Sequence, residues 1–272
     1  MNPRKATSLD IPEIKLLWKS VFSDSDDFVN RFITHFGIEH CYVCEINGEI
    51  AAMAFALHSQ ISNLNSQISN LNSLFYVYAC ATHPQYRRQG IMTKLLETIY
   101  NEACRENVAG IFLRAANQNL EIYYRKLGFE EFFYGGRACF KHGGHGGYKE
   151  DAEVQFITPK MYSEKRLQKL ENYCFVNWGE CFFNFLYETG MRFCEYENNI
   201  FSVRIEKETL IIDELLGDAP KEEIASLVFK HFSDFKTVEI CFLEQKNCCG
   251  QIKWRQPFNE NPKKGYFAFA ME

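Results

Sequence analysis

A short basic turn between a predicted strand and a predicted helix carries residues whose types and spacing suit ligand chemistry. Residues 77–82 are apolar or small and predict a buried strand. The segment His83-Pro84-Gln85 ends that strand, because proline donates no ladder hydrogen bond. After Gly90 the apolar residues recur at steps of three and four, which is typical of one helix face: Met92, Leu95, Leu96, Ile99 and Ala103.

The order strand, turn, helix suits an anionic ligand. The first amides of the helix have no internal partner, and the helix dipole adds partial positive charge at that end. Gly90 allows the backbone to approach a ligand closely, and Arg87 and Arg88 add two full charges beside it. The turn therefore predicts a site for a phosphate or pyrophosphate.

Two segments resemble motifs of the GNAT superfamily of acyl-CoA N-acyltransferases. Its coenzyme A loop reads Gln/Arg-x-x-Gly-x-Gly/Ala, which Arg87 and Gly90 fit, while Met92 replaces the final small residue. Residues 117–129 resemble the Tyr-x-x-x-Gly-Phe signature of the same family, with Tyr124 at its first position. The alternative is a generic strand-to-helix turn followed by a helix with a glycine cap.

The resemblance implies which residues bind coenzyme A and which one acts chemically. Tyr124 matches the position whose phenol protonates the departing sulfur, the alternative being a core tyrosine bonded to backbone; the neighbouring Tyr123 misses the spacing. Acetyl-CoA would be the co-substrate, and no metal is implied. The implied cofactor-binding residues are Cys80, Ala81 and Thr82 on the central strand, Arg87, Arg88, Gln89, Gly90, Ile91, Met92 and Thr93 in the loop, and Asn117 and Asn119 opposite.

The elements predicted around these motifs follow the order that the GNAT resemblance implies. In that fold the central strand and its parallel neighbour splay apart, and the pantetheine arm lies between them. The predicted elements are a strand at 4–7, two helices capped by Asp10 and Ser25, a hairpin over 41–58, the strand and helix described above, a strand at 110–116, a helix at 119–126 and a closing strand pair at 129–140.

The chain is long enough for two domains, at 272 residues. The Gly-rich segment 142–148 indicates a linker; its two histidines lack a carboxylate or thiol shell for a metal. The remainder repeats the element order without the loop, and it resembles the degenerate C-terminal half of tandem GNAT proteins. We predict an α/β fold with a mixed sheet: a GNAT domain at 1–141, the linker, and a GNAT-like domain at 149–272.

Composition narrows the function classes. The net charge of −5 argues against general nucleic-acid binding. The sequence has no apolar run of the roughly 18 residues that a membrane span requires, and its eleven scattered cysteines suggest reduced thiols in a cytoplasmic protein. The segment 60–66 is repeated unchanged at 67–73, which indicates a duplication that lengthened a surface loop.

The sequence predicts an enzyme that moves an acetyl or similar acyl group from acetyl-CoA to a primary amine of a small molecule or peptide. A non-catalytic acyl-CoA-binding or sensory module is the alternative. Aminoacyl transfer from tRNA is a third hypothesis, and the coenzyme A loop argues against it. The amine must lose a proton, since an alkyl ammonium has a pKa of about 10.4. Candidate bases are Glu45, Glu49, His58, His83 and, by resemblance to the tandem group named for enhanced intracellular survival, the C-terminal carboxylate of Glu272. Acceptor identity, acyl-chain preference and oligomeric state stay open.

Overall fold

The computed structural model describes residues 2–63, 72–143, 153–256 and 264–269, and it divides into two compact units. Unit 1 contains Met1–Phe132 and the segment that follows from Gly250, and unit 2 contains Phe133–Cys249 and the segment that follows from Lys264. The units therefore do not coincide with the predicted domains at 1–141 and 149–272. Two strands, Glu130–Lys141 and Thr237–Trp254, each contribute residues to both units.

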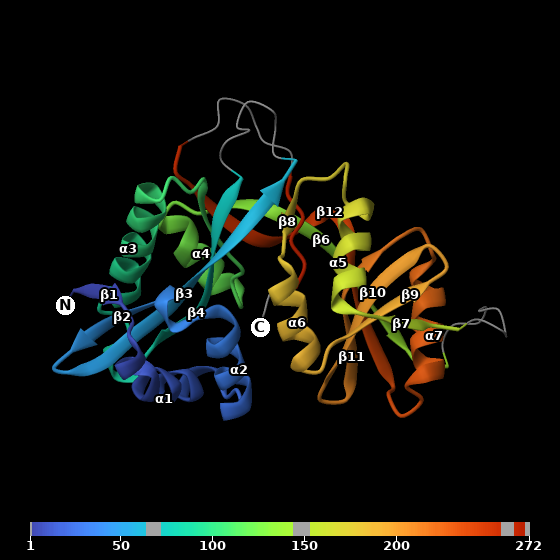
Figure 1. Cartoon of the computed structure of the whole chain (residues 1–272), viewed down its shortest axis with the longest axis horizontal. Coiled ribbons are helices and arrows are strands. Elements are labelled where there is room, and N and C mark those ends of the chain that lie inside the picture. The colour runs from blue at the N-terminus through green and yellow to red at the C-terminus, as the bar shows by residue number, and fades with distance from the viewer. Residues whose placement is uncertain (1, 64–71, 144–152, 257–263, 270–272) are drawn as a thin grey trace. The chain divides into compact units, whose positions relative to one another are not determined.

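Unit 1 is built on a sheet in the order β1-β2-β3-β4-β5, followed by the last residues of β12 (Thr237–Trp254). All neighbouring strands are antiparallel except β4 and β5, which are parallel. Figure 1 shows its elements, which are β1 (Pro3–Lys5), α1 (Ile11–Phe22), α2 (Asp26–Phe36), β2 (Cys41–Ile46), β3 (Glu49–Ser62), β4 (Ser73–Thr82), α3 (Ile91–Arg105), β5 (Gly110–Leu113) and α4 (Gln118–Lys126).

Helices cover both faces of this sheet, as the alternation along β3 shows. Phe55 packs against Trp18 of α1, with ring centroids 5.6 Å apart. The flanking Ala54 and Ala56 belong instead to the core cluster built around Leu95 of α3. Since successive strand residues point to opposite faces, α1 and α2 lie on one face and α3 on the other.

The helix starts confirm one predicted cap and correct another. The Ser25 hydroxyl accepts a hydrogen bond from the Phe28 amide, so it caps α2 as predicted. Asp10 precedes α1, but its side chain makes no cap bond. Its carboxylate accepts bonds from Arg4 and Thr7 instead, because an arginine side chain on the adjacent strand offers a charged donor.

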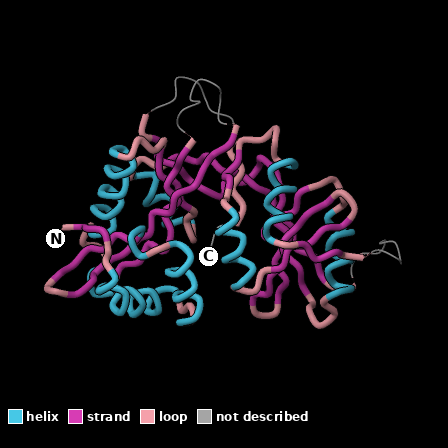
Figure 2. The backbone as a smooth tube through the Cα atoms, viewed as in Figure 1, coloured by secondary structure: helices cyan, strands magenta, loops and turns pink. Residues whose placement is uncertain are grey.

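Unit 2 repeats the order of unit 1 apart from one additional short strand, and its sheet runs β12-β11-β10-β9-β7. Figure 2 shows the strands of the chain in magenta and its helices in cyan. Its segment Lys264–Phe269 is bound within this unit: the Tyr266 amide donates to Cys174 O, and Trp178 Nε1 donates to Ala268 O. The elements of this half are β6 (Glu130–Lys141), β7 (Gln155–Ile157), α5 (Pro159–Lys169), β8 (Phe175–Asn177), α6 (Glu180–Glu188), β9 (Arg192–Tyr196), β10 (Asn199–Glu206), β11 (Thr209–Leu216), α7 (Lys221–His231) and β12 (Thr237–Trp254).

Three further predictions differ from the structure or lie outside it. The predicted closing strand pair at 129–140 is the single strand β6, and the predicted strand at 110–116 ends at Leu113. Most of the repeated segment, most of the Gly-rich linker and Glu272 lie outside the described residues. None of the helices in the described ranges combines the length and apolar character needed to cross a bilayer.

Candidate active site

The site begins where β4 and β5 separate. The two strands pair in parallel only from Leu74 opposite Gly110 to Tyr76 opposite Phe112. Beyond Tyr76, β4 continues to Thr82 while β5 ends at Leu113. The backbone groups on that side of the last residues of β4 are therefore left without a ladder partner from β5, which leaves an edge that an extended ligand can pair with.

A β-bulge re-aims the side chains at this point. Met53 of β3 pairs with Ala81 and Phe55 pairs with Tyr78, so β4 has one extra residue, and Ala79 takes a φ of 52°. Without the bulge, Tyr78 and Cys80 would share a face. Instead Tyr78 packs on the α1/α2 side, whereas Cys80 packs against the α3 cluster that includes Tyr124.

The loop after β4 has the backbone shape that an anion site requires. Gly90, the N-cap of α3, has a φ of 74°, which favours glycine, and no side chain caps the helix. Space is open in front of Gly90, since nothing lies within 4 Å of the position that a Cβ would occupy. Arg88 is exposed and also has a positive φ, of 64°. The first amides of α3 thus face open space beside an arginine, which fits a pyrophosphate.

The other predicted loop residues divide into structural and ligand-facing groups. Arg87 Nε donates to Thr82 O at 3.1 Å and Gln89 Nε2 donates to Gln85 O at 3.3 Å, so both side chains brace the loop. Ile91 is buried in the core and Met92 packs against it, so these two offer their backbone amides rather than their side chains. Ala81 is fully buried in the ladder with β3.

The Tyr-x-x-x-Gly-Phe spacing has a local structural cause. The Phe129 amide donates to Tyr124 O and the Gly128 amide donates to Arg125 O, which is a Schellman motif at the end of α4. Gly128 takes the left-handed conformation, with a φ of 87°, and the rings of Tyr124 and Phe129 lie 5.6 Å apart. The signature therefore fixes the backbone and ring of Tyr124.

The hydroxyl of Tyr124 meets the thiol of Cys80 in a buried setting. Burial raises the pKa of Tyr124 well above its ordinary value, and the neighbouring Cys80 raises it further. Burial also raises the pKa of Cys80 to about 12, although its interaction with Tyr124 opposes the rise. Both groups are therefore protonated at neutral pH, and Tyr124 holds a proton that it can donate.

Helix α4 places the remaining predicted residues in different settings. Asn117 caps the helix through its Oδ1, which accepts from the Leu120 amide at 3.1 Å, while Asn119 is exposed. The Tyr123 hydroxyl lies 3.0 Å from Thr93 Oγ1 and so links α4 to the first turn of α3. Sequence reasoning gave Tyr123 no role, because a bond between two helices is not visible from spacing along one of them.

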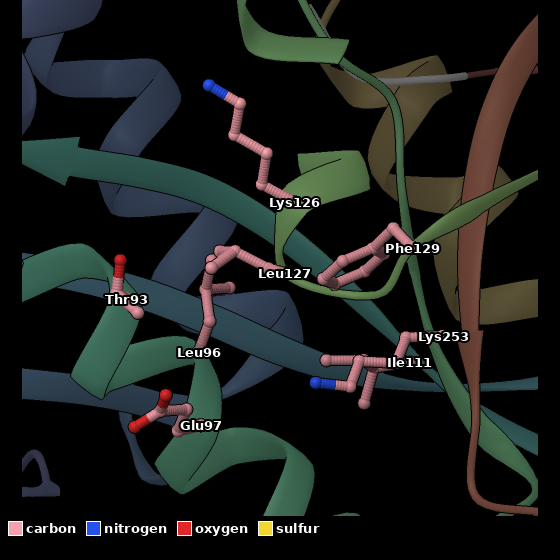
Figure 3. A pocket seen from close by; sticks show the side chains of 8 residues that line it. All are labelled: Thr93, Leu96, Glu97, Ile111, Lys126, Leu127, Phe129 and Lys253. Carbon is pink, nitrogen blue, oxygen red and sulfur yellow. The ribbon is translucent and has the colours of Figure 1, made fainter. Parts of the chain in front are cut away.

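A cavity of about 190 Å³ lies beside this loop, between α3, the end of α4, β5 and β12 (Figure 3). Its floor is apolar, and hydroxyl and charged groups stand around it. Lys253 Nζ lies 4.4 Å from the centre of the Tyr100 ring, which holds this lysine in place. The lining residues are Thr93, Leu96, Glu97, Ile111, Lys126, Leu127, Phe129 and Lys253. Sequence reasoning missed this cavity, because Lys253 is far from the other residues along the chain.

Four of the five base candidates lie within the described residues, and the structure gives each of them a local setting. Glu45 pairs with Arg4 at 2.5 Å, and Glu49 accepts a hydrogen bond from the Tyr86 hydroxyl. His58 lies opposite Phe75, near the start of β4 rather than at the bulge. The His83 amide donates to Ala51 O, at the end of β4 that leads into the loop. Among the described residues, no group of three or more His, Cys, Asp or Glu side chains is arranged for a metal ion.

Comparison with known protein families finds a match to the first half of the chain. Residues 2–132 match the family described as an acetyltransferase (GNAT) domain. The match ends at Phe132, the residue of β6 at which the first segment of unit 1 also ends. No curated protein matches the sequence.

Solved structures match nearly the whole chain at low sequence identity. A probable N-acyltransferase from Enterococcus faecalis is 13% identical, with a TM-score of 0.73 over 93% of this chain and 72% of that one. Eis1 from Mycobacterium abscessus is 10% identical, with a TM-score of 0.63 over 93% and 74%. A tandem GNAT protein from the clavulanic acid biosynthesis pathway is 11% identical, with a TM-score of 0.57 over 94% and 98%. These matches extend across both units, and the fold is a tandem one.

Proposed function

We propose that this chain transfers an acetyl group from acetyl-CoA to a primary amine of a small molecule or peptide. The proposal proceeds from its membership in the GNAT superfamily, to which residues 2–132 match, and from its tandem GNAT fold. The observation that carries the proposal is the buried Tyr124 hydroxyl at the β4 bulge, beside the opening between β4 and β5. A phosphate-type loop leads directly from the same strand.

The residues present fit coenzyme A along its length. The open first turn of α3 suits the pyrophosphate, with Arg88 as a charged partner. The unpaired edge of β4 from Tyr78 to Thr82 offers backbone groups to the pantetheine amides. Cys80 lies on this edge, so the thioester end of the ligand would reach Tyr124 there.

The cavity beside α3 suits the adenosine end. Its floor of Leu96, Leu127 and Phe129 can cover a flat ring, while the two lysines can pair with a ribose phosphate. Lys126 and Lys253 come from different elements, so a ligand held by both would bind α4 to β12. This assignment makes the cavity part of the coenzyme A site.

The pKa of the Cys80 thiol indicates how strongly a thiolate is disfavoured at the proposed reaction centre. Its own thiol has a pKa raised by burial to about 12. A thiolate that leaves in the same surroundings is equally deprived of water, so it is a strong base and takes up a proton readily. In the proposed reaction the amine nitrogen bonds to the carbonyl carbon, the carbon–sulfur bond breaks, and Tyr124 donates its proton to the sulfur. The proton of the amine passes to solvent or to a base.

A screen of amines with acetyl-CoA tests the proposal. Wild-type protein is incubated with acetyl-CoA and panels of small-molecule and peptide amines, and the released free thiol is measured. Turnover with at least one primary amine, lost in Tyr124→Phe, supports the proposal. Stabilisation by acetyl-CoA without turnover on any amine would favour the non-catalytic binding module instead.

A further inference from the structure

Helix α4, which carries Tyr124, is held on the sheet of unit 1 by little apolar burial. Tyr124 is the only buried residue among the nine of Gln118–Lys126. A helix of this length is marginal by itself, so its position depends on the contacts that its neighbours provide. One such contact is the bond between Tyr123 and Thr93 of α3. Two further contacts come from the end of β12.

Gln251 and Lys253 lie on the face of β12 that supports this helix. They pair with Leu113 and Ile111 of β5, which both belong to the core cluster on the α3 side of the sheet. Directly paired residues share a face of a sheet, so both β12 side chains point to that side. The Lys253 side chain passes beside the end of α4, since its Cε lies 3.6 Å from the position that a Cβ of Gly128 would occupy.

Gln251 is a buried polar link between β12 and α4. It is 2% exposed, and its Nε2 donates to the Glu121 carbonyl oxygen at 3.3 Å. The other end of its amide, Oε1, is buried and has no hydrogen-bond partner among the described residues. Burying an unsatisfied carbonyl costs free energy, and an apolar side chain of the same size would avoid that cost. Within the described part of the chain, the bond to α4 is therefore the interaction that requires an amide at this position.

This bond lies one helical turn before Tyr124. Glu121 and Tyr124 are three residues apart, so they occupy neighbouring positions on one face of α4. The Schellman motif at the end of α4 fixes the Tyr124 ring to the backbone of the helix, so the ring moves whenever the helix shifts against the sheet. Proton transfer requires hydrogen-bond reach, and a displacement of about 1 Å is sufficient to impair it. A bond that fixes α4 therefore also fixes the hydroxyl beside Cys80.

Building on the proposed function, we propose that Gln251 is a positioning residue for acyl transfer. It holds α4 where the Tyr124 hydroxyl reaches the sulfur of the thioester, and it acts through Tyr124 without taking part in the bond changes. Gln251 lies outside residues 2–132, which match the acetyltransferase family. The chemistry of unit 1 thus depends on a side chain that the end of β12 supplies.

Steady-state kinetics with acetyl-CoA and an amine found in the acceptor screen test the inference. Gln251→Met keeps the approximate volume of the side chain and removes the donor. We expect kcat to fall about tenfold, less than in Tyr124→Phe because the proton donor is displaced and not removed, while the KM for acetyl-CoA stays within about twofold of wild type. Ser59→Ala is the matched control, since it removes a buried side-chain bond to the Leu74 carbonyl oxygen and should leave kcat unchanged.

The double variant Gln251→Met/Tyr124→Phe separates positioning from general structural support. If Gln251 acts through Tyr124, the double variant turns over no more slowly than Tyr124→Phe alone. A loss of equal size in both backgrounds overturns the inference, and so does a Gln251→Met protein with the kcat of wild type. Gln251→Asn, whose amide is one methylene shorter and loses the reach for the bond, gives the same test if the methionine variant does not fold.

Amide exchange of α4 distinguishes a failure of this inference from a failure of the proposed function. Hydrogen–deuterium exchange of the free protein needs no acceptor. Exchange at residues 121–126 should be faster in Gln251→Met than in wild type and unchanged in Ser59→Ala. If wild type acetylates no amine and this difference persists, the proposed function fails and the support of α4 by Gln251 stands. Unchanged exchange in Gln251→Met overturns that support.

Discussion

Unit 1 and unit 2 share the succession strand, strand, helix, strand, but the two parallel strands at the centre of each sheet pair over different lengths. In unit 1, β4 leaves β5 after Tyr76. In unit 2, β11 remains paired with β12 from Thr209 as far as Leu215, which lies opposite Phe242. The same topology is therefore open at one centre and closed by backbone pairing at the other.

The helices that follow these strands also differ at their first turns. The first turn of α3 has no acidic residue, and its N-cap is Gly90. The first turn of α7 carries Glu222 and Glu223, whose charges oppose an anion at that end. The preceding loop is already satisfied, because Asn199 Oδ1 accepts from the Ala219 amide at 2.9 Å. The start of α7 is therefore poorly suited to bind a phosphate group.

Unit 2 has a buried ion pair between β11 and α5. Glu214 near the end of β11 and Arg166 of α5 are 0% and 1% exposed, with Arg166 Nε 2.8 Å from Glu214 Oε2. The Tyr162 hydroxyl donates to the same oxygen at 2.8 Å. The corresponding stretch of β4 holds Cys80 and the edge left open to a ligand. The same succession of elements therefore leaves an open strand edge in unit 1 and encloses a buried ion pair in unit 2, so the residues and the strand register, and not the topology, decide which unit could hold a ligand.

The largest expected effect comes from giving the loop of unit 1 an acidic group like those of α7. Gly90→Asp puts a carboxylate where the pyrophosphate is proposed to bind and strains a φ of 74°. If acetyl-CoA binds as proposed, it should raise the melting temperature of wild type by mass action, and this shift should disappear in the variant. Thermal unfolding with and without acetyl-CoA measures it.

Gly48→Asp is the matched control for strain. Gly48 has a φ of 84° in the turn between β2 and β3, and nothing lies within 4 Å of its Cβ position either. This variant should lose a similar amount of intrinsic stability and keep the full acetyl-CoA shift. A Gly90→Asp protein stabilised as much as wild type would show that the loop does not bind the phosphates.

The next effect concerns Tyr124, the proposed proton donor. Tyr124→Phe keeps the ring contact with Phe129 and removes the hydroxyl beside Cys80. With an acceptor in hand, kcat should fall by roughly 10²–10³ while the KM for acetyl-CoA changes little. Tyr162→Phe removes the hydroxyl from the buried pair of unit 2 and should leave kcat unaffected. Equal kcat for Tyr124→Phe and wild type would remove Tyr124 from the mechanism.

The pH dependence of turnover follows from the same group. Burial raises the folded-state pKa of Tyr124 above its ordinary value of about 10. If Tyr124 is the proton donor, it should stay protonated through the neutral and mildly alkaline range, and any loss of kcat due to its ionisation should appear at higher pH than for an ordinary tyrosine. A tyrosine-dependent alkaline decline between pH 8 and pH 9 would contradict the buried setting of Tyr124.

The order of elements and the two motifs were accessible from sequence because they depend on local periodicity and turn residues. The bulge at Ala79 was not, since it arises from the register between β3 and β4 and places a non-glycine residue at positive φ.

The predicted domain boundary rests on composition, since the Gly-rich stretch at 142–148 has the composition of a linker. The two compact units of the structure divide within β6 and β12, at positions that composition does not mark. Strand β12 continues to Trp254 because its last residues pair with β5. Pairing partners that lie far apart in sequence set both features, and composition does not report them.

Breaking the ion pair of unit 2 should affect stability rather than chemistry. Glu214→Gln leaves Arg166 buried without a counter-charge, which typically costs about 3 kcal/mol. Urea unfolding followed by fluorescence measures the loss, and acetyl-CoA titration checks the site in unit 1. A matched control is Glu206→Gln, where the carboxylate is exposed and the cost should be small. A Glu214→Gln protein as stable as wild type would mean that the pair does not stabilise unit 2.

A smaller effect is expected in the cavity beside α3. Lys126→Ala removes one ammonium from the cavity lining, where unit 1 is proposed to hold the ribose phosphate. The Kd for coenzyme A should rise about fivefold, the scale of an exposed charge-assisted contact. The Kd for dephospho-coenzyme A, which lacks that phosphate, should not change between variant and wild type. An equal rise for both ligands would assign Lys126 to another part of coenzyme A.

The smallest effect concerns the bond that joins α4 to the loop. The Tyr123 hydroxyl and Thr93 Oγ1 lie 3.0 Å apart in a half-buried setting. A neutral hydrogen bond contributes about 1 kcal/mol or less, so Tyr123→Phe should raise the Kd for acetyl-CoA at most about fivefold and leave kcat nearly unchanged. Thr93→Val removes the same bond from its other end. If the bond is the cause, the double variant should bind acetyl-CoA no more weakly than the weaker single variant, whereas additive losses would show that the two residues act independently.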